Sequence, residues 1–80
     1  MGSFIIHIYY IMKKEVQSVI FNKSKFTLNS ASSWIIKNGF KIGRVDITKN
    51  YYRFRQYNPS KNKKYRIKTL TSSIKLVLEF

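Results

Sequence analysis

Basic and aromatic side chains alternate along residues 51–57, and these residue types suggest anion binding rather than catalysis. In the run YYRFRQY, Arg53 and Arg55 lie between Tyr51 and Tyr57 at every second position. An extended strand projects alternate side chains to one face, so we expect these four side chains to lie together. Guanidinium groups bind phosphate, and tyrosine rings stack on nucleobases. The pattern predicts a surface for nucleic acid or for another acidic partner.

The same alternation resumes after a proline-marked loop at 58–64. We expect residues 51–68 to form a hairpin in which Ile67 faces the helix. Arg66 and Lys68 then lie on the outer face beside the arginines of the first strand. The predicted anion-binding residues are Tyr51, Arg53, Arg55, Tyr57, Lys61, Lys63, Lys64, Arg66 and Lys68.

Such a face brings like charges onto neighbouring strands, where they repel one another. Among the acidic residues nearby in sequence, only Asp46 could reach them from the preceding strand. A phosphate backbone would relieve the repulsion, whereas a plain solvated face would serve to prevent pairing between sheet edges. Four basic residues joined by a lysine-rich loop favour anion binding.

The composition of the whole chain also indicates a basic binding domain. Its 80 residues include 16 Lys and Arg against three Asp and Glu, for a net charge of +13. Eleven of the basic residues lie in residues 41–80. The absence of cysteine and the single histidine exclude disulfides, a thiol nucleophile and a histidine-rich metal site. We expect a protein that is not an enzyme, holds no cofactor or metal, and binds a polyanion.

The elements that must position these residues form one small domain at residues 16–80. Thr27 is a plausible helix N-cap, and Asn38-Gly39 ends the helix. Trp34 lies beside the apolar stripe of this helix, and we expect it in the core rather than stacked on a base. The expected fold is α+β, an antiparallel sheet of about four to five strands with one helix packed on one face, in the order β-α-β-β-β-β.

Residues 1–15 are treated separately from this domain. The apolar run at 4–12 is too short to span a bilayer, and its lysines follow it, which is the reverse of a signal peptide. The segment is either an additional strand or an extension that precedes Met12. We expect a protein that neither spans a membrane nor is secreted, and the sequence does not fix its oligomeric state.

The sequence YRFRQ at residues 52–56, followed by Pro59 and Arg66, resembles a motif of a known protein family. With Ala31 and Trp34 in the helix, they make residues 16–80 similar to a small domain of unassigned role in tailed phages and giant DNA viruses. In phages this domain also occurs beside or joined to head-morphogenesis and prohead-protease proteins. The family usually has glycine where this chain has Ser73 and Glu79. The resemblance implies a virus-encoded protein and brings no catalytic role.

Three functions remain after these considerations. The favoured one is a non-enzymatic basic module of the virion, located in the particle or in the cytoplasm of the infected cell. A ribosomal-type structural RNA-binding subunit would show the same charge. A metal-independent ribonuclease of toxin-like type could use Arg53, Arg55, Tyr57 and Arg66 on a scissile phosphate, but such folds usually contain more helix than this chain offers.

Overall fold

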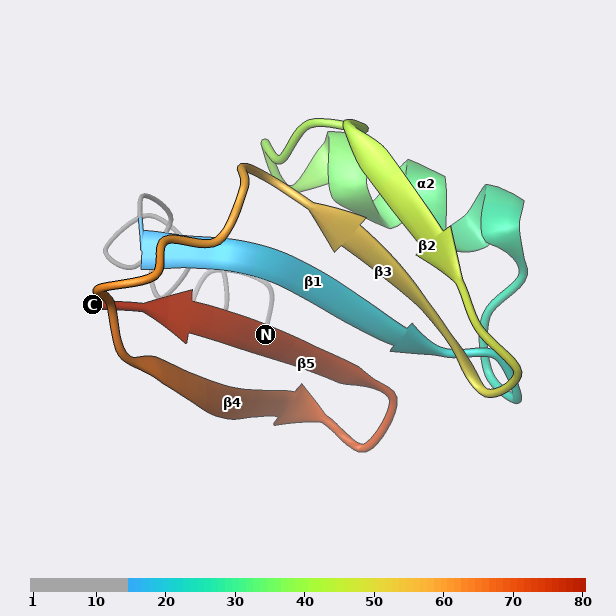
Figure 1. Ribbon diagram of the computed structural model, residues 1–80. Coiled ribbons are helices and arrows are strands. Elements are labelled where there is room, and N and C mark those ends of the chain that lie inside the picture. The colour runs from blue at the N-terminus through green and yellow to red at the C-terminus, as the bar shows by residue number, and fades with distance from the viewer. Residues whose placement is uncertain (1–14) are drawn as a thin grey trace.

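The structure is a computed structural model that describes residues 15–80, and it consists of one helix and a five-stranded antiparallel sheet (Figure 1). The element order confirms the α+β fold that was predicted from the sequence. The interpretation of the N-terminal segment as a strand or an extension lies outside the described residues. The elements are β1 (Val16–Asn22), α2 (Leu28–Lys37), β2 (Arg44–Ile47), β3 (Tyr51–Arg55), β4 (Tyr65–Thr71) and β5 (Ile74–Glu79).

The strands lie in the spatial order β2-β3-β1-β5-β4, with β1 at the centre. β3 and β4 are therefore separated by two strands, and the predicted hairpin at 51–68 is wrong. Residues 56–64 instead carry the chain from one side of β1 to the far edge of the sheet (Figure 1). The physical reason lies in β5, where Leu76, Val77 and Leu78 are all buried. A strand that buries both faces needs a neighbour on each side, whereas the more polar β4 suits an edge.

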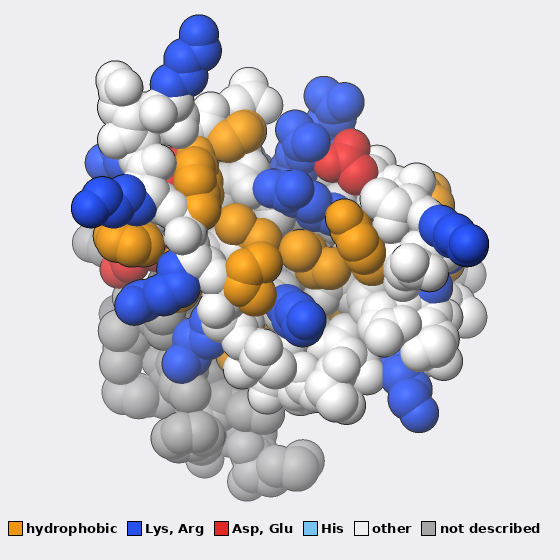
Figure 2. All heavy atoms as spheres, turned by 60° about the horizontal axis from the view of Figure 1, so that its bottom comes forward, with side chains coloured by type: hydrophobic (Ala, Val, Ile, Leu, Met, Phe, Trp, Pro, Cys, Tyr) orange, Lys and Arg blue, Asp and Glu red, His pale blue; other side chains and the backbone are white. Residues whose placement is uncertain are grey.

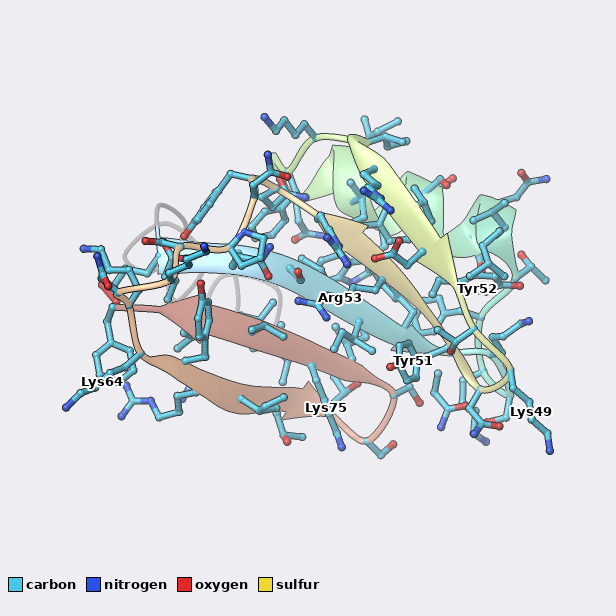
Figure 3. All side chains as sticks on the ribbon, viewed as in Figure 1. Lys49, Tyr51, Tyr52, Arg53, Lys64 and Lys75 are labelled. Carbon is cyan, nitrogen blue, oxygen red and sulfur yellow. The ribbon has the colours of Figure 1, made fainter. Side chains whose placement is uncertain are left out.

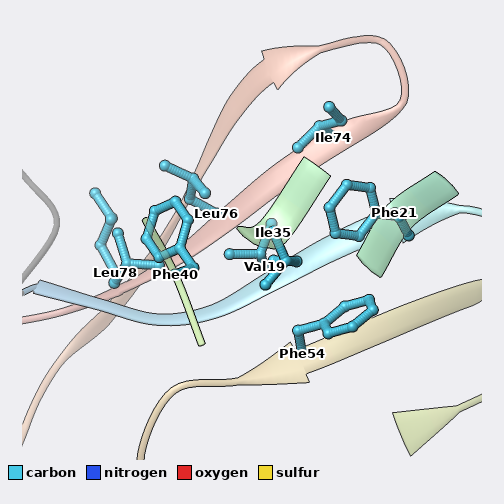
Figure 4. Packing of buried hydrophobic residues seen from close by; sticks show 10 residues of the cluster. Val19, Phe21, Ile35, Phe40, Phe54, Ile74, Leu76 and Leu78 are labelled. Atoms are coloured by element: carbon cyan, nitrogen blue, oxygen red, sulfur yellow. The ribbon is translucent and has the colours of Figure 1, made fainter. Parts of the chain in front are cut away.

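The strand register divides the side chains of the sheet between two faces. Val19 of β1 pairs with Phe54 on one side and with Leu76 on the other, and all three are fully buried. Together with the buried residues of α2 they form one cluster, so we call this the helix face (Figure 4). The next residue, Ile20, pairs with Arg53 and Lys75. These side chains point to the opposite side, which we call the outer face.

The helix begins and ends where local sequence predicts. Thr27 is the N-cap, and its hydroxyl accepts a hydrogen bond from the backbone N–H of Ser30, whose own side chain completes a capping box. Asn38 is the C-cap, and Gly39 follows with a φ of 79°, a conformation that glycine adopts without strain. Ala31 and Ile35 are buried and belong to the same cluster as the helix-face residues of the sheet.

Aromatic rings fill the middle of this cluster. Phe21 contacts Trp34 and Phe54 in edge-to-face geometry, with ring centroids 5.4 Å apart in each pair. Trp34 also stacks on Phe40 at 6.2 Å between centroids. The placement of Trp34 against the core confirms the sequence prediction. Ile67, which was expected to face the helix, is 56% exposed and lies outside the cluster.

Candidate nucleic-acid interface

Arg53 lies on the outer face as predicted, but its guanidinium has internal partners. Its Nε donates to Ser18 Oγ at 2.9 Å, and its Nη2 donates to Gln17 Oε1 at 2.9 Å. Both acceptors belong to fully buried residues at an irregularity in the pairing of β1 with β5. Such a bulge redirects side chains, and here it brings two polar groups under the arginine. Arg53 therefore satisfies buried hydrogen-bonding groups of β1.

Arg55 is also neutralised within the domain. Its Nε lies 2.7 Å from Asp46 Oδ2, and Arg44 Nε lies 3.4 Å from the other oxygen of the same carboxylate. Asp46 therefore reaches the cations of the outer face from β2, as the sequence suggested. One carboxylate shared by two guanidinium groups removes part of the repulsion that was expected to favour phosphate.

Arg66 and Lys68 do not join the arginines of β3, so the prediction that all four share one face is wrong. They pair with Leu78 and Leu76, so their side chains lie on the helix face at the exposed edge of the sheet. The guanidinium of Arg66 lies 5.4 Å from the centre of the Phe80 ring. The alternation of side chains along β4 was predicted correctly. The pairing of β4 with β5 determines which face of the sheet each set of side chains lies on. β5 directs the basic residues of β4 toward the helix side.

The loop residues of the predicted site form a third group, away from the arginines. Lys61, Lys63 and Lys64 are exposed, and Lys64 exchanges backbone hydrogen bonds with Phe80. In Figure 3, Lys64 lies at the opposite end of the sheet from Tyr51. Tyr57 lies just beyond β3, where its carbonyl accepts a hydrogen bond from Gln17 Nε2 at 2.6 Å. Partial burial, and then the nearby carboxylates, raise the pKa of the Tyr57 hydroxyl.

Tyr51 borders a hollow on the outer face, between two turns of the sheet (Figure 3). The hollow has a volume of about 150 Å³. The half-buried Ile20 of β1 and the exposed Lys75 of β5 also line it. Its remaining lining residues are polar and uncharged, namely Asn22, Asn50, Ser72 and Ser73.

Lys75 lines this hollow, further cations lie near it, and none of its lining residues is acidic. Arg53 and Lys75 both pair with Ile20, which places their Cα atoms two strand spacings apart, about 9–10 Å. Lys49 lies in the neighbouring turn, near Tyr51 in Figure 3. Within residues 15–80, neither Lys49 nor Lys75 takes part in an ion pair. In that part of the chain their ammonium groups are free of internal ion pairs, whereas the guanidinium groups of Arg53 and Arg55 have partners within the domain.

The sequence-based site omitted Lys75 and Lys49, although a signal for Lys75 was present. Lys75 is the one basic residue in an otherwise mostly apolar strand, between Ile74 and Leu76. A charged residue between two buried ones must point to the other face of the sheet. Lys49 belongs to a turn, where alternation gives no information about direction.

Comparison with family models, curated proteins and solved structures found no match to the chain. Among the residues that the structure describes, no helix has the length and apolar character needed to cross a membrane.

Proposed function

We propose that this protein is a non-enzymatic basic module that binds nucleic acid through the outer face of its sheet. The observation that carries the proposal is the hollow beside Tyr51, which is lined by Lys75, has Lys49 in the adjacent turn, and has no acidic lining residue. Lysine ammonium groups neutralise phosphates, and an exposed aromatic ring offers a stacking surface for bases. A net charge of +13 adds a long-range attraction for any polyanion.

Both side-chain carboxylates of residues 16–80, those of Asp46 and Glu79, make contacts within the domain. This supports a binding role over acid–base catalysis. Asp46 is held by Arg44 and Arg55. Glu79 accepts a hydrogen bond of 2.6 Å from the Tyr65 hydroxyl and another of 3.0 Å from the backbone N–H of Ser60. The contacts of Glu79 link the end of β5 to the start of β4 and to the preceding loop.

The resemblance to phage and giant-virus domains extends the proposal to a component of the virion. Nucleic acid is favoured over an acidic protein because the hollow combines an aromatic wall with polar side chains and nearby cations. Detection of the protein in purified virus particles would support this location. Its recovery in ribosome fractions would instead support the ribosomal-type alternative, and cleavage of RNA by the pure protein would support the ribonuclease.

The salt dependence of binding tests the interface directly. For single strands, each neutralised phosphate contributes about 0.7 to the slope of log K against log salt concentration. We expect Lys75→Gln to lower that slope by about 0.7, which corresponds to about fourfold weaker binding at 0.15 M salt relative to a 1 M reference. Because a phosphate contact carries no sequence information, all oligonucleotide sequences should be affected alike.

Lys68→Gln is the matched control for this experiment. Lys68 and Lys75 lie on paired strands, both are exposed, and each substitution removes one positive charge. Their side chains point to opposite faces of the sheet. If Lys68→Gln lowers the slope as much as Lys75→Gln does, the outer face is not the binding surface and the proposal is wrong.

A further inference from the structure

We infer that the hollow beside Tyr51 holds one unpaired nucleobase, so that the ligand is single-stranded nucleic acid. This inference rests on the proposed function and specifies its substrate class. The described residues also include an exposed edge strand, β4, and a basic loop at 56–64. Each borders a larger but more open hollow: the one at β4 has no aromatic lining residue, and in the one beside Tyr57 the lining residues Arg44 and Arg55 are paired with Asp46. The hollow beside Tyr51 combines a volume, an aromatic wall, hydrogen-bonding groups and a cation, Lys75, that forms no ion pair within residues 15–80.

The size and lining of the hollow suit a flat heteroaromatic ring. A cavity of about 150 Å³ accommodates a benzene-sized ring, so one pyrimidine or the six-membered ring of a purine fits. Ile20 and the Tyr51 ring supply apolar surface for its faces. The side chains of Asn22, Asn50, Ser72 and Ser73 supply donors and acceptors for its polar edge.

Backbone hydrogen bonds hold the two walls of the hollow in place. The backbone N–H of Asn22 donates to Ser73 O at 2.9 Å, and that of Lys23 donates to Asn50 O at 3.0 Å. These bonds tie the β4–β5 turn and the β2–β3 turn to the end of β1, so the hollow exists before a ligand binds.

A threonine hydroxyl fixes the conformation of each turn. Thr48 Oγ1 accepts from the backbone N–H of Tyr51 at 3.1 Å, and Thr71 Oγ1 accepts from those of Ser73 and Ile74 at 3.1 Å. A site whose backbone is already ordered loses less conformational entropy on binding, which favours affinity for a single small group.

The outer face continues beyond the hollow as an apolar stripe. Ile20 pairs with Lys75, and the buried Val77, two residues further along β5 and on the same face, pairs with the exposed Ile67. Figure 2 shows hydrophobic side chains gathered in the middle of this face, with Lys and Arg around them. An apolar strip bordered by cations matches a single strand, which exposes base faces and phosphates together. A duplex keeps the faces of its bases stacked inside and offers phosphates and base edges instead, so it presents no base face to such a strip.

Base stacking and phosphate binding can be separated with two probes. One is an oligothymidylate of about twelve nucleotides, and the other is inorganic polyphosphate, which carries charge but no base. We expect Tyr51→Ala to weaken oligothymidylate binding about 5–150-fold, equivalent to the ~1–3 kcal/mol of one stacked base. Its affinity for polyphosphate should stay within about twofold of the native value, because Lys75 and Lys49 remain.

Two further variants show whether a loss of affinity in Tyr51→Ala comes from the missing ring or from a disturbed fold. Tyr51→Phe retains the ring and should restore most of the oligothymidylate affinity that Tyr51→Ala loses. Ser73→Leu fills the hollow while Tyr51 stays in place, and it should reproduce the loss seen with Tyr51→Ala. Thermal melts confirm that each variant is folded at the temperature of the assay.

The possible outcomes separate this inference from the proposed function. If Tyr51→Ala and Ser73→Leu both bind oligothymidylate as the native protein does, the hollow does not hold a base. If Lys75→Gln has no effect on either probe, the proposed function itself fails. Binding of thymidine monophosphate as tightly as oligothymidylate would identify a free nucleotide as the ligand and overturn the single-strand assignment. Equal affinity for a duplex of the same length would also overturn it.

Discussion

Replacing Arg53 by methionine should destabilise the fold more than any comparable change on the outer face. The substitution keeps an unbranched side chain but removes both hydrogen bonds to buried groups of β1, at Ser18 and Gln17. A hydrogen bond from a charged donor contributes about 1.5–3 kcal/mol, but the two acceptors keep a bond to each other, because Ser18 Oγ also donates to Gln17 Oε1. Arg53 itself is only partly buried, so water can replace some of its contacts. We therefore expect a loss of about 2 kcal/mol in the free energy of unfolding.

Thermal unfolding followed by circular dichroism measures this loss. In a domain of this size, 1 kcal/mol shifts the melting temperature by about 4–8 °C, so Arg53→Met should melt roughly 8–16 °C lower. Lys75→Met is the control, since Lys75 is exposed on the same face and takes part in no ion pair within residues 15–80. It should change the stability by less than about 0.5 kcal/mol.

A double-mutant cycle with Ser18→Ala assigns the effect to the contact. If the hydrogen bond from Arg53 to Ser18 is responsible, the two substitutions should be non-additive by about 0.5–3 kcal/mol. The reasoning is refuted if Arg53→Met melts with the native protein and loses nucleic-acid affinity instead. Arg53 would then be a ligand-binding residue, and its contacts with β1 would be incidental.

Three other predictions concern the core, the alkaline stability and the N-terminal segment. Trp34→Ala should cost about 3 kcal/mol or more and abolish cooperative melting of so small a domain; a variant that melts normally and loses only ligand binding would contradict the core assignment. Partial burial, and then the hydrogen bond to Glu79, raise the pKa of the Tyr65 hydroxyl above its ordinary value of 10.0. The protonated hydroxyl therefore stabilises the folded state below pH 10.0, and this stabilisation is lost as the pH rises through the pKa of the folded state. Melts recorded across this range should depend less on pH in Tyr65→Phe, and an unchanged dependence would show that the pair with Glu79 is not formed in solution. A chain that starts at Met12 should fold like the full chain, because β1 already has a strand on each side; loss of the melting transition would show that residues 1–11 supply part of the fold.

Local sequence was sufficient wherever the structure is decided by neighbours in the chain. Thr27, Asn38 and Gly39 set the limits of α2 through hydrogen bonds and backbone preferences that span a few residues. The order of the elements followed from such local signals. The core role of Trp34 followed from the helical spacing of its neighbours.

The candidate site could be predicted only in part, because sheet faces depend on partners far away in sequence. Alternation correctly placed Arg66 and Lys68 on one face of β4. The pairing with Leu78 and Leu76 of β5 decides whether this is the helix face or the outer face. The alternation within β4 would look the same in either case. The hollow beside Tyr51 is lined by residues of two turns about 20 residues apart, and the sequence of neither turn indicates that the other lies beside it.

The central position of β1 also determines when the domain can fold during synthesis. β1 is the first described strand, and one of its two partners is β5, the last. About 50 residues separate them, which at 5–20 residues per second means a delay of roughly 3–10 s before the sheet can close. During this interval the apolar run of β1 lacks a neighbour and is exposed to other nascent chains. Ten of the eleven basic residues in 41–80 are added during this same interval, so the growing chains repel one another more strongly as synthesis proceeds, which opposes their aggregation.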